Sequence, residues 1–229
     1  MNALAIDSAG PAMKVAAKNN LQTVTVELNI GPKQSQEILP AIDYVMEKAS
    51  LTPDSLDYLT LCKGPGTFTG LRLAFSALKA LELAFGKPVY GISTLECYAY
   101  PYKDFNGYVV STIDAKKNQF FAAVYKNGKA IMAPKDTSIQ EVASYFDFSK
   151  NEAVLCTGPD RQYFSSLLKQ HFPDAQIICF SEEPSACSTL FTLAEKMIEE
   201  NKAPLKDFEG PEYLRKSEAE LNLLSAKEF

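Results

Sequence analysis

The chain of 229 residues has no tryptophan, a single histidine and five cysteines, with no C-x-x-C pair among them. One histidine cannot build a two-histidine metal site, and we expect His171 late in a helix, where the helix dipole favours a cation. An odd number of cysteines without paired spacing predicts neither a disulfide framework nor a structural zinc site. Reduced, mostly buried thiols are typical of the cytoplasm, which is the expected location.

Long apolar runs and excess positive charge are missing as well. No stretch reaches the roughly 18 apolar residues that indicate a membrane-spanning helix. The N-terminus has no basic start and meets an acid at Asp7, so we expect no signal peptide. The net charge of −5 argues against strong autonomous binding to nucleic acid, because an acidic surface repels phosphates. Hydrophobic residues make up 46% of the chain, which suffices for a core without metals or disulfides.

The first half of the chain shows an ordered series of apolar patterns. We expect strands at 3–6, 14–17, 21–28, 56–62 and 88–91, and helices at 35–49, at 71–85 and after Ser93. Three antiparallel strands followed by alternating helices and strands are typical of a ribonuclease-H-like layer.

The second half repeats this series. We expect strands at 108–114, 119–125, 129–133, 153–156 and 176–180, and helices at 138–146, 161–171 and 188–200. Ile113-Asp114 at the end of the first strand of this half repeats Ile6-Asp7 at the end of the first strand of the other half. We therefore predict an α/β protein of two tandem ribonuclease-H-like domains, each a mixed five-stranded sheet with flanking helices. The predicted bounds are 1–104 and 105–215, with a C-terminal tail at 216–229.

The densest motif lies between a predicted strand and a predicted helix. Its members are Gly64, Pro65, Gly66, Thr67, Phe68, Thr69, Gly70 and Arg72. Glycine loops at helix N-termini can bind anions, but this spacing matches neither G-x-G-x-x-G nor the P-loop. The favoured alternative is a tight strand-to-helix turn with Thr69 as N-cap.

The helix predicted at 71–85 is unusually apolar. Its polar residues, Arg72, Ser76, Lys79 and Glu82, form one narrow stripe, whereas a surface helix has a wider polar face. The helix must therefore be covered on more than one side. Either the second domain or another subunit could provide the cover.

Asp7 and Asp114 each end the first strand of one half. In sugar-kinase and actin-like ATPases, acids at this position hold the metal and phosphate or activate water. A strand-end aspartate is also a common turn former, which is the preferred interpretation because the second half lacks a matching glycine-threonine loop. No G-x-S-x-G nucleophile elbow occurs, so we expect no catalytic residue, no cofactor and no metal.

Six segments in order along the whole chain carry a resemblance to one known family. They are LAIDS at 4–8, QSQEILP at 34–40, GPGTFTGLR at 64–72, VYGISTL at 89–95, IDAK at 113–116 and PEYLR at 211–215. Together they resemble the TsaB (YeaZ) family. Two positions depart from its pattern: Gln34 replaces the usual histidine, and Ser8-Ala9-Gly10 follows Asp7, which weakens any nucleotide or metal role there.

The resemblance implies two actin-like domains and a non-catalytic role in making threonylcarbamoyladenosine in tRNA. It implies binding to the catalytic subunit TsaD, which transfers threonylcarbamoyl to the adenosine next to the anticodon, with the ATPase TsaE joining them. It also implies a homodimer through the same surface in isolation, and contact with tRNA only through the complex.

The resemblance places the partner surface on the helices of the first domain. The expected contact residues are Ile38, Ile42, Val45, Ala74, Ala77, Leu78 and Leu81. Aspartate at Leu78 or Ala77 is then expected to abolish pairing while the monomer stays folded. Two alternatives remain: an actin-like nucleotide-binding enzyme or peptidase-like protein acting alone, and a structural homodimer with another client.

Overall fold

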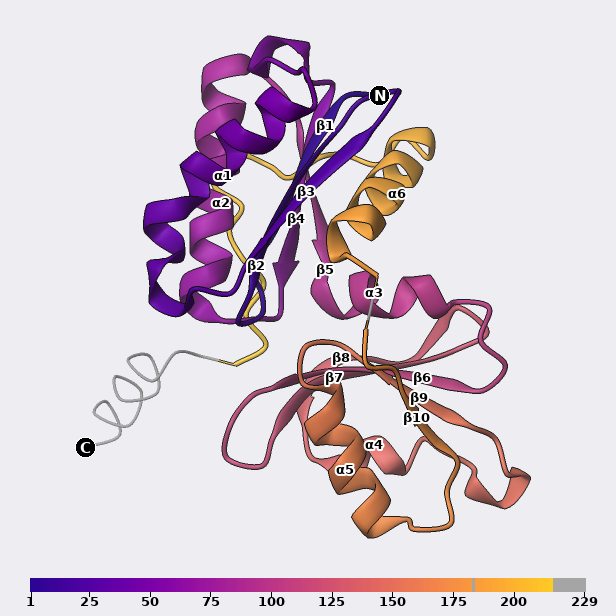
Figure 1. Cartoon of the computed structure of the whole chain (residues 1–229). Helices are drawn as coiled ribbons and strands as arrows, with labels where there is room; N and C mark the ends of the chain where they lie inside the picture. The colour runs from indigo at the N-terminus through magenta and orange to yellow at the C-terminus, as the bar shows by residue number, and fades with distance from the viewer. Residues whose placement is uncertain (183, 216–229) are drawn as a thin grey trace, which may run out of the picture.

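The computed structural model describes residues 1–182 and 184–215, which form two five-stranded sheets with helices around them (Figure 1). The first sheet has the order β3-β2-β1-β4-β5. Its strands are β1 (Ala3–Asp7), β2 (Met13–Lys18), β3 (Thr23–Leu28), β4 (Tyr58–Gly64) and β5 (Val89–Ser93). The pairings β1–β2 and β2–β3 are antiparallel, whereas β1–β4 and β4–β5 are parallel.

The second sheet has the order β10-β9-β6-β7-β8, and like the first it has two adjacent antiparallel pairs, β6–β7 and β7–β8, and two adjacent parallel pairs, β6–β9 and β9–β10. Its strands are β6 (Tyr108–Asp114), β7 (Phe120–Lys126), β8 (Lys129–Thr137), β9 (Val154–Thr157) and β10 (Ile177–Cys179). The predicted fold class, two ribonuclease-H-like units with mixed five-stranded sheets, is therefore confirmed.

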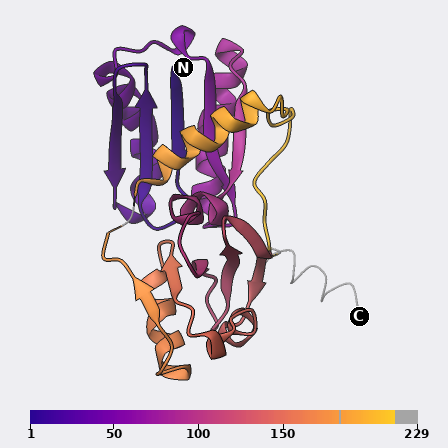
Figure 2. The same ribbon diagram turned by 90° about the vertical axis from the view of Figure 1, so that its right-hand side faces the viewer.

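The helices cover both faces of the first sheet. On one face lie α1 (Gln34–Lys48) and α2 (Phe68–Phe85), and on the other lies α6 (Ala186–Glu199) (Figures 1 and 2). The short α3 (Thr94–Ala99) lies between the two sheets and contacts both. On the second sheet, α4 (Ile139–Ala143) and α5 (Arg161–His171) share the face away from α3. Single 3-10 turns occupy Gly31–Lys33, Pro53–Ser55, Tyr100–Tyr102 and Phe148–Lys150.

We call β1–β5 with α1, α2 and α6 the first lobe, and β6–β10 with α4 and α5 the second lobe. The position of α6 differs from what the repeat predicts, since its residues fall in the second predicted domain. It packs on the first sheet, where Leu190 and Phe191 join the cluster around Tyr58 and Tyr90. The short α3 already covers the corresponding face of the second sheet. The apolar side of α6 is therefore buried against the first sheet.

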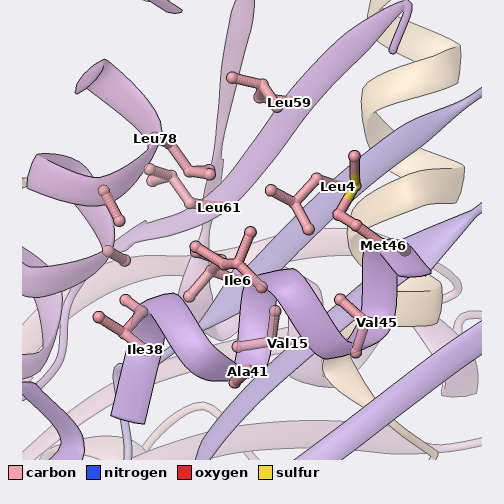
Figure 3. Close-up of a cluster of buried hydrophobic side chains, with 14 of the residues drawn as sticks. Leu4, Ile6, Val15, Ile38, Ala41, Val45, Met46, Leu59, Leu61 and Leu78 are labelled. Carbon is pink, nitrogen blue, oxygen red and sulfur yellow. The ribbon is translucent and has the colours of Figure 1, made fainter. Parts of the chain in front are cut away.

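The core of the first lobe lies between its sheet and the pair α1 and α2. Side chains from the strands, such as Leu4, Ile6 and Leu61, point toward side chains from the two helices, such as Val45 and Leu78 (Figure 3). All five have at most 1% relative exposure. No helix in the described part of the chain is long and apolar enough to cross a membrane.

Candidate functional site

The glycine motif forms a closed turn against the β1–β2 loop. The amide of Thr67 donates to the carbonyl of Ala9 at 2.8 Å, and the Ser8 hydroxyl donates to the carbonyl of Gly70 at 2.6 Å. A Cβ at Gly70 would lie 1.9 Å from the Ser8 carbonyl oxygen, and one at Gly66 would lie 2.7 Å from the Ala9 Cβ. These glycines therefore allow two backbones to touch, which favours the tight turn over an open phosphate cradle.

The helix begins earlier than the sequence pattern predicts. α2 starts at Phe68, so Thr69 lies inside its first turn and Thr67 occupies the N-cap position, without a side-chain cap bond. The prediction of Thr69 as N-cap is wrong. The extended backbone of Thr67 is fixed instead by its bond to the β1–β2 loop, a contact that local sequence cannot reveal.

The other side of the motif is clamped by residues near the end of the described chain. The amide of Glu212 donates to the Lys63 carbonyl at 2.7 Å, and the two side chains form an ion pair at 3.2 Å. Tyr213 stacks on Phe68 with ring centroids 5.2 Å apart, and Arg72 donates to the Tyr213 hydroxyl at 3.0 Å. The motif is thus held between two loops from opposite ends of the sequence.

Asp7 is buried, with 2% exposure. Its carboxylate accepts hydrogen bonds from the Tyr98 hydroxyl at 3.0 Å and from the Ala9 amide at 3.1 Å. Burial raises the pKa of Asp7, and the charge of Lys14 and these hydrogen bonds oppose the rise. Both oxygens of this acid are therefore engaged by the protein itself.

Asp114 has a different environment. It forms an ion pair with Lys116 at 2.7 Å, and its own amide donates to Asp160 at 2.7 Å. Desolvation raises the pKa of Asp114, but its hydrogen bonds and ion pair with Lys116 outweigh this and hold the pKa below its ordinary value. The two strand-end acids thus have opposite pKa shifts and separate partners.

A cleft of about 490 Å³ lies between the lobes beside Asp7. Its walls meet where Gly10 of the first lobe approaches Pro159 of the second: a Cβ at Gly10 would lie 3.4 Å from the Pro159 Cβ. The charged side chains that line it, besides Asp7, are Lys14, Glu27, Arg161 and Glu182. Within residues 1–182 and 184–215, no three histidine, cysteine or acidic side chains are grouped so as to hold a metal ion.

The single histidine lies at the end of a helix and most of the cysteines are buried, as predicted. His171 is the last residue of α5, and its ring contacts the Leu167 carbonyl at 2.9 Å. All five thiols are free, and only Cys179 is not fully buried. None of them lies in the cleft beside Asp7.

The residues predicted to contact a partner lie inside the first lobe. Their relative exposures are Ile38 2%, Ile42 6%, Val45 0%, Ala74 1%, Ala77 8% and Leu78 0%, and Leu81 is half-buried against the same core. As surface contacts these residues are wrong, because this face of both helices covers the chain's own sheet. The polar stripe does not mark a fully exposed face of α2, because Lys79 and Glu82 pair with each other at 2.7 Å and are only 21% exposed.

The exposed faces of α1 and α2 carry other apolar side chains. Leu39 and Tyr44 on α1 are 61% and 49% exposed. On α2, Leu83 is 90% exposed and Phe85 36%, and Ala80, one turn before Leu83, is also exposed. The signal in the sequence was Leu83, an apolar residue four positions after Lys79 on the polar stripe of the helix.

Comparisons with known proteins agree on one group of relatives. Residues 31–223 match the family model described as TsaD, tRNA N6-adenosine threonylcarbamoyltransferase. The chain is 24% identical to the tRNA threonylcarbamoyladenosine biosynthesis protein TsaB of Bacillus subtilis (strain 168), over 99% of this chain and all of that protein. It is 32% identical to TsaB of Escherichia coli (strain K12), over 55% of each chain.

A solved structure has the same fold over nearly the whole chain. This is a protein of Pseudomonas aeruginosa described as similar to peptidase YEAZ, with a TM-score of 0.74 and 22% identity. The match covers 93% of this chain and 99% of that one, so both lobes and their arrangement are shared.

Proposed function

We propose that this chain, which belongs to the TsaB (YeaZ) family of tRNA threonylcarbamoyladenosine biosynthesis proteins, is a non-catalytic subunit that binds and supports TsaD. The family places the chain in the formation of threonylcarbamoyladenosine in tRNA. The observation that carries the proposed role within that process is the set of exposed apolar side chains on α1 and at the end of α2.

The proposal of a non-catalytic role rests on the strand-end acids. Tyr98 covers Asp7, and Lys116 neutralises Asp114. The loop at Gly10 approaches Pro159 of the second lobe, where a Cβ at Gly10 would lie 3.4 Å from the Pro159 Cβ. Asp7 could serve a metal and a nucleotide only after giving up its hydrogen bond from Tyr98. The pair of Asp114 with Lys116 is a surface ion pair, since the Lys116 side chain is 80% exposed, and its loss costs little.

Calorimetry with ATP and magnesium tests the non-catalytic role. We expect no measurable heat of binding and no hydrolysis by the isolated chain. The alternative, an actin-like nucleotide-binding enzyme, is favoured by Lys14 and Arg161 beside the cleft of about 490 Å³. Tight binding with hydrolysis would establish that alternative. Lys14→Ala, which removes one of these cations, would then have to weaken binding.

The proposed partner surface is the outer face of α1 and α2. Leu39 and Tyr44 of α1 and Leu83 and Phe85 of α2 supply exposed apolar area. Exposed large apolar side chains are candidates for a protein-protein contact. A contact of standard size would bury about 1,600 Å² in total.

The other partners follow from the same assignment. In isolation the chain forms a homodimer through this face, so that binding of TsaD and self-association compete. TsaE joins the pair of subunits, and tRNA is bound only through the complex, as the net charge of −5 favours.

Copurification with TsaD, followed by size-exclusion chromatography with and without it, tests the partner assignment. We expect a dimer alone and a one-to-one complex when TsaD is added. A dimer that persists beside free TsaD would favour a structural homodimer with another client.

A further inference from the structure

The segment 203–215 follows α6 and runs along the first lobe toward the second (Figure 2). We call it the interlobe strap. Near its start, the amide of Leu205 donates to the Val89 carbonyl of β5 at 2.8 Å, and the Leu205 side chain packs against the first core. One residue later, the carbonyl of Lys206 accepts a hydrogen bond from Lys79 of α2 at 3.0 Å. The strap is therefore attached to both the sheet edge and α2.

Glu212 and Tyr213, near the end of the strap, contact the glycine motif. A Cβ at Gly64 would lie 2.2 Å from the Glu212 carbonyl oxygen, so the two backbones touch. The guanidinium of Arg72 lies 3.8 Å from the Phe68 ring centroid and donates to the Tyr213 hydroxyl. Phe68 and Arg72 belong to the first turns of α2, so the strap orders the helix where it begins.

The strap then reaches the second lobe through Arg215. Its guanidinium donates twice to Asp136, at 2.5 Å from Nε and 2.8 Å from Nη2, and once to the Ala115 carbonyl at 2.6 Å. Asp136 lies on β8, and Ala115 follows β6, so two strands of the second sheet share this anchor. The Arg215 side chain is 31% exposed and that of Asp136 22%, and a bidentate pair shielded in this way is stronger than an ordinary surface ion pair.

We propose that the interlobe strap couples the position of the second lobe to the first turn of α2, with Arg215 and Tyr213 as positioning residues for the partner surface. The strap physically joins three separate sequence motifs, at 64–72, 113–116 and 211–215. Apart from it, the chain crosses between lobes only beside α3 and before α6 within the described residues. A third connection resists rotation of one lobe against the other. It also contacts the start of α2, the helix whose last turn carries part of the proposed partner surface. The link to TsaD rests on the proposed function, whereas the link between the lobes does not.

Arg215→Ala tests the coupling, with Glu152→Ala as the matched control. Glu152 forms a partly exposed ion pair with Lys126 at 2.6 Å, but both residues belong to the second lobe. We measure amide hydrogen exchange over residues 64–72 in the full chain. Arg215→Ala is expected to accelerate it about tenfold although Arg215 contacts none of these residues, and Glu152→Ala is expected to leave it unchanged. Unchanged exchange at 64–72 in Arg215→Ala would overturn the proposal.

Two further variants separate positioning from general loss of stability. Arg215→Lys keeps the charge but cannot form the bidentate pair, and is expected to give an intermediate acceleration. Tyr213→Phe keeps the stack on Phe68 but loses the bond from Arg72, so the acceleration should be confined to the first turn of α2. If Arg215→Ala unfolds, these two variants decide the result.

Titration with TsaD provides the second measurement. Arg215→Ala is expected to bind TsaD about tenfold more weakly than Glu152→Ala does. Equal affinities together with faster exchange would limit the strap to joining the lobes and refute its role at the partner surface. Failure of the unmodified chain to bind TsaD would refute the proposed function instead, and the exchange measurement would still decide the coupling.

Discussion

Replacement of Leu83 by lysine separates the partner surface from the fold. Leu83 lies in the last turn of α2 and is 90% exposed. Lysine has a similar helix propensity, and a cation is favoured near a helix C-terminus. The free energy of unfolding should therefore change by less than about 0.5 kcal/mol, as is usual for surface substitutions.

The effect on binding should be much larger. A leucine side chain buried at an interface contributes about 1.5–3 kcal/mol. Its loss weakens binding by about tenfold to 100-fold, since about 1.4 kcal/mol corresponds to a factor of ten. Burial of the lysine charge against apolar side chains of TsaD would increase the loss further.

Leu78→Ala on the same helix provides the contrasting case. Leu78 has 0% exposure and lies in the first core (Figure 3), so its truncation should destabilise the chain by about 2–5 kcal/mol. Aspartate at Leu78 or Ala77 would place a charge in this core, so we now expect these variants to destabilise the monomer instead of leaving it folded.

Urea denaturation measures the stability of both variants, and titration with TsaD measures binding. The expected pattern is normal stability with weak binding for Leu83→Lys, and low stability for Leu78→Ala. If Leu83→Lys binds TsaD with the affinity of the unmodified chain, the end of α2 is not the partner surface.

The remaining predictions concern the motif turn and Asp7. Gly70→Ala would place a Cβ 1.9 Å from the Ser8 carbonyl, so we expect a loss of more than about 2 kcal/mol in thermal denaturation. An unchanged melting temperature would contradict the close packing. Burial raises the pKa of Asp7, so the folded chain favours the protonated carboxyl. The stability that this preference contributes is fully present below the ordinary aspartate pKa of about 3.9 and is lost as the pH rises through the raised pKa. Asp7→Asn should therefore flatten the decline of stability with rising pH. If the free energy of unfolding has the same dependence on pH in both proteins between pH of about 4 and 7, burial does not raise the pKa of Asp7.

Local patterns predicted the elements well where the side chains alternate or repeat at helical spacing. The strands at Ala3–Asp7 and Tyr108–Asp114 and the helix at Arg161–His171 lie within a residue or two of their predicted bounds. The start of α2 was missed by three residues, because Phe68 and Thr69 have no helical pattern of their own. Contacts with the β1–β2 loop and with Tyr213 hold them in the helix.

The surface of α2 shows why helix patterns alone do not identify an interface. Periodicity gives the spacing of apolar residues but not which neighbour covers them. Ala77 and Leu78 face the chain's own sheet, and Leu83 does not, although all three look alike in the sequence. In addition, Lys79 pairs with Glu82 and donates a hydrogen bond to the Lys206 carbonyl of the strap, so part of the polar stripe is covered.

The sequence by itself determined the fold class, the repeat of two similar halves and the family, because each depends on residues close together or on short motifs. Only the tertiary structure decided that α6 covers the first sheet and that Pro211–Arg215 connects the lobes. It also decided that Tyr98 donates a hydrogen bond to Asp7. These features depend on contacts between residues far apart in the chain. Such contacts leave no periodic pattern in the sequence, because the residues that make them are not regularly spaced.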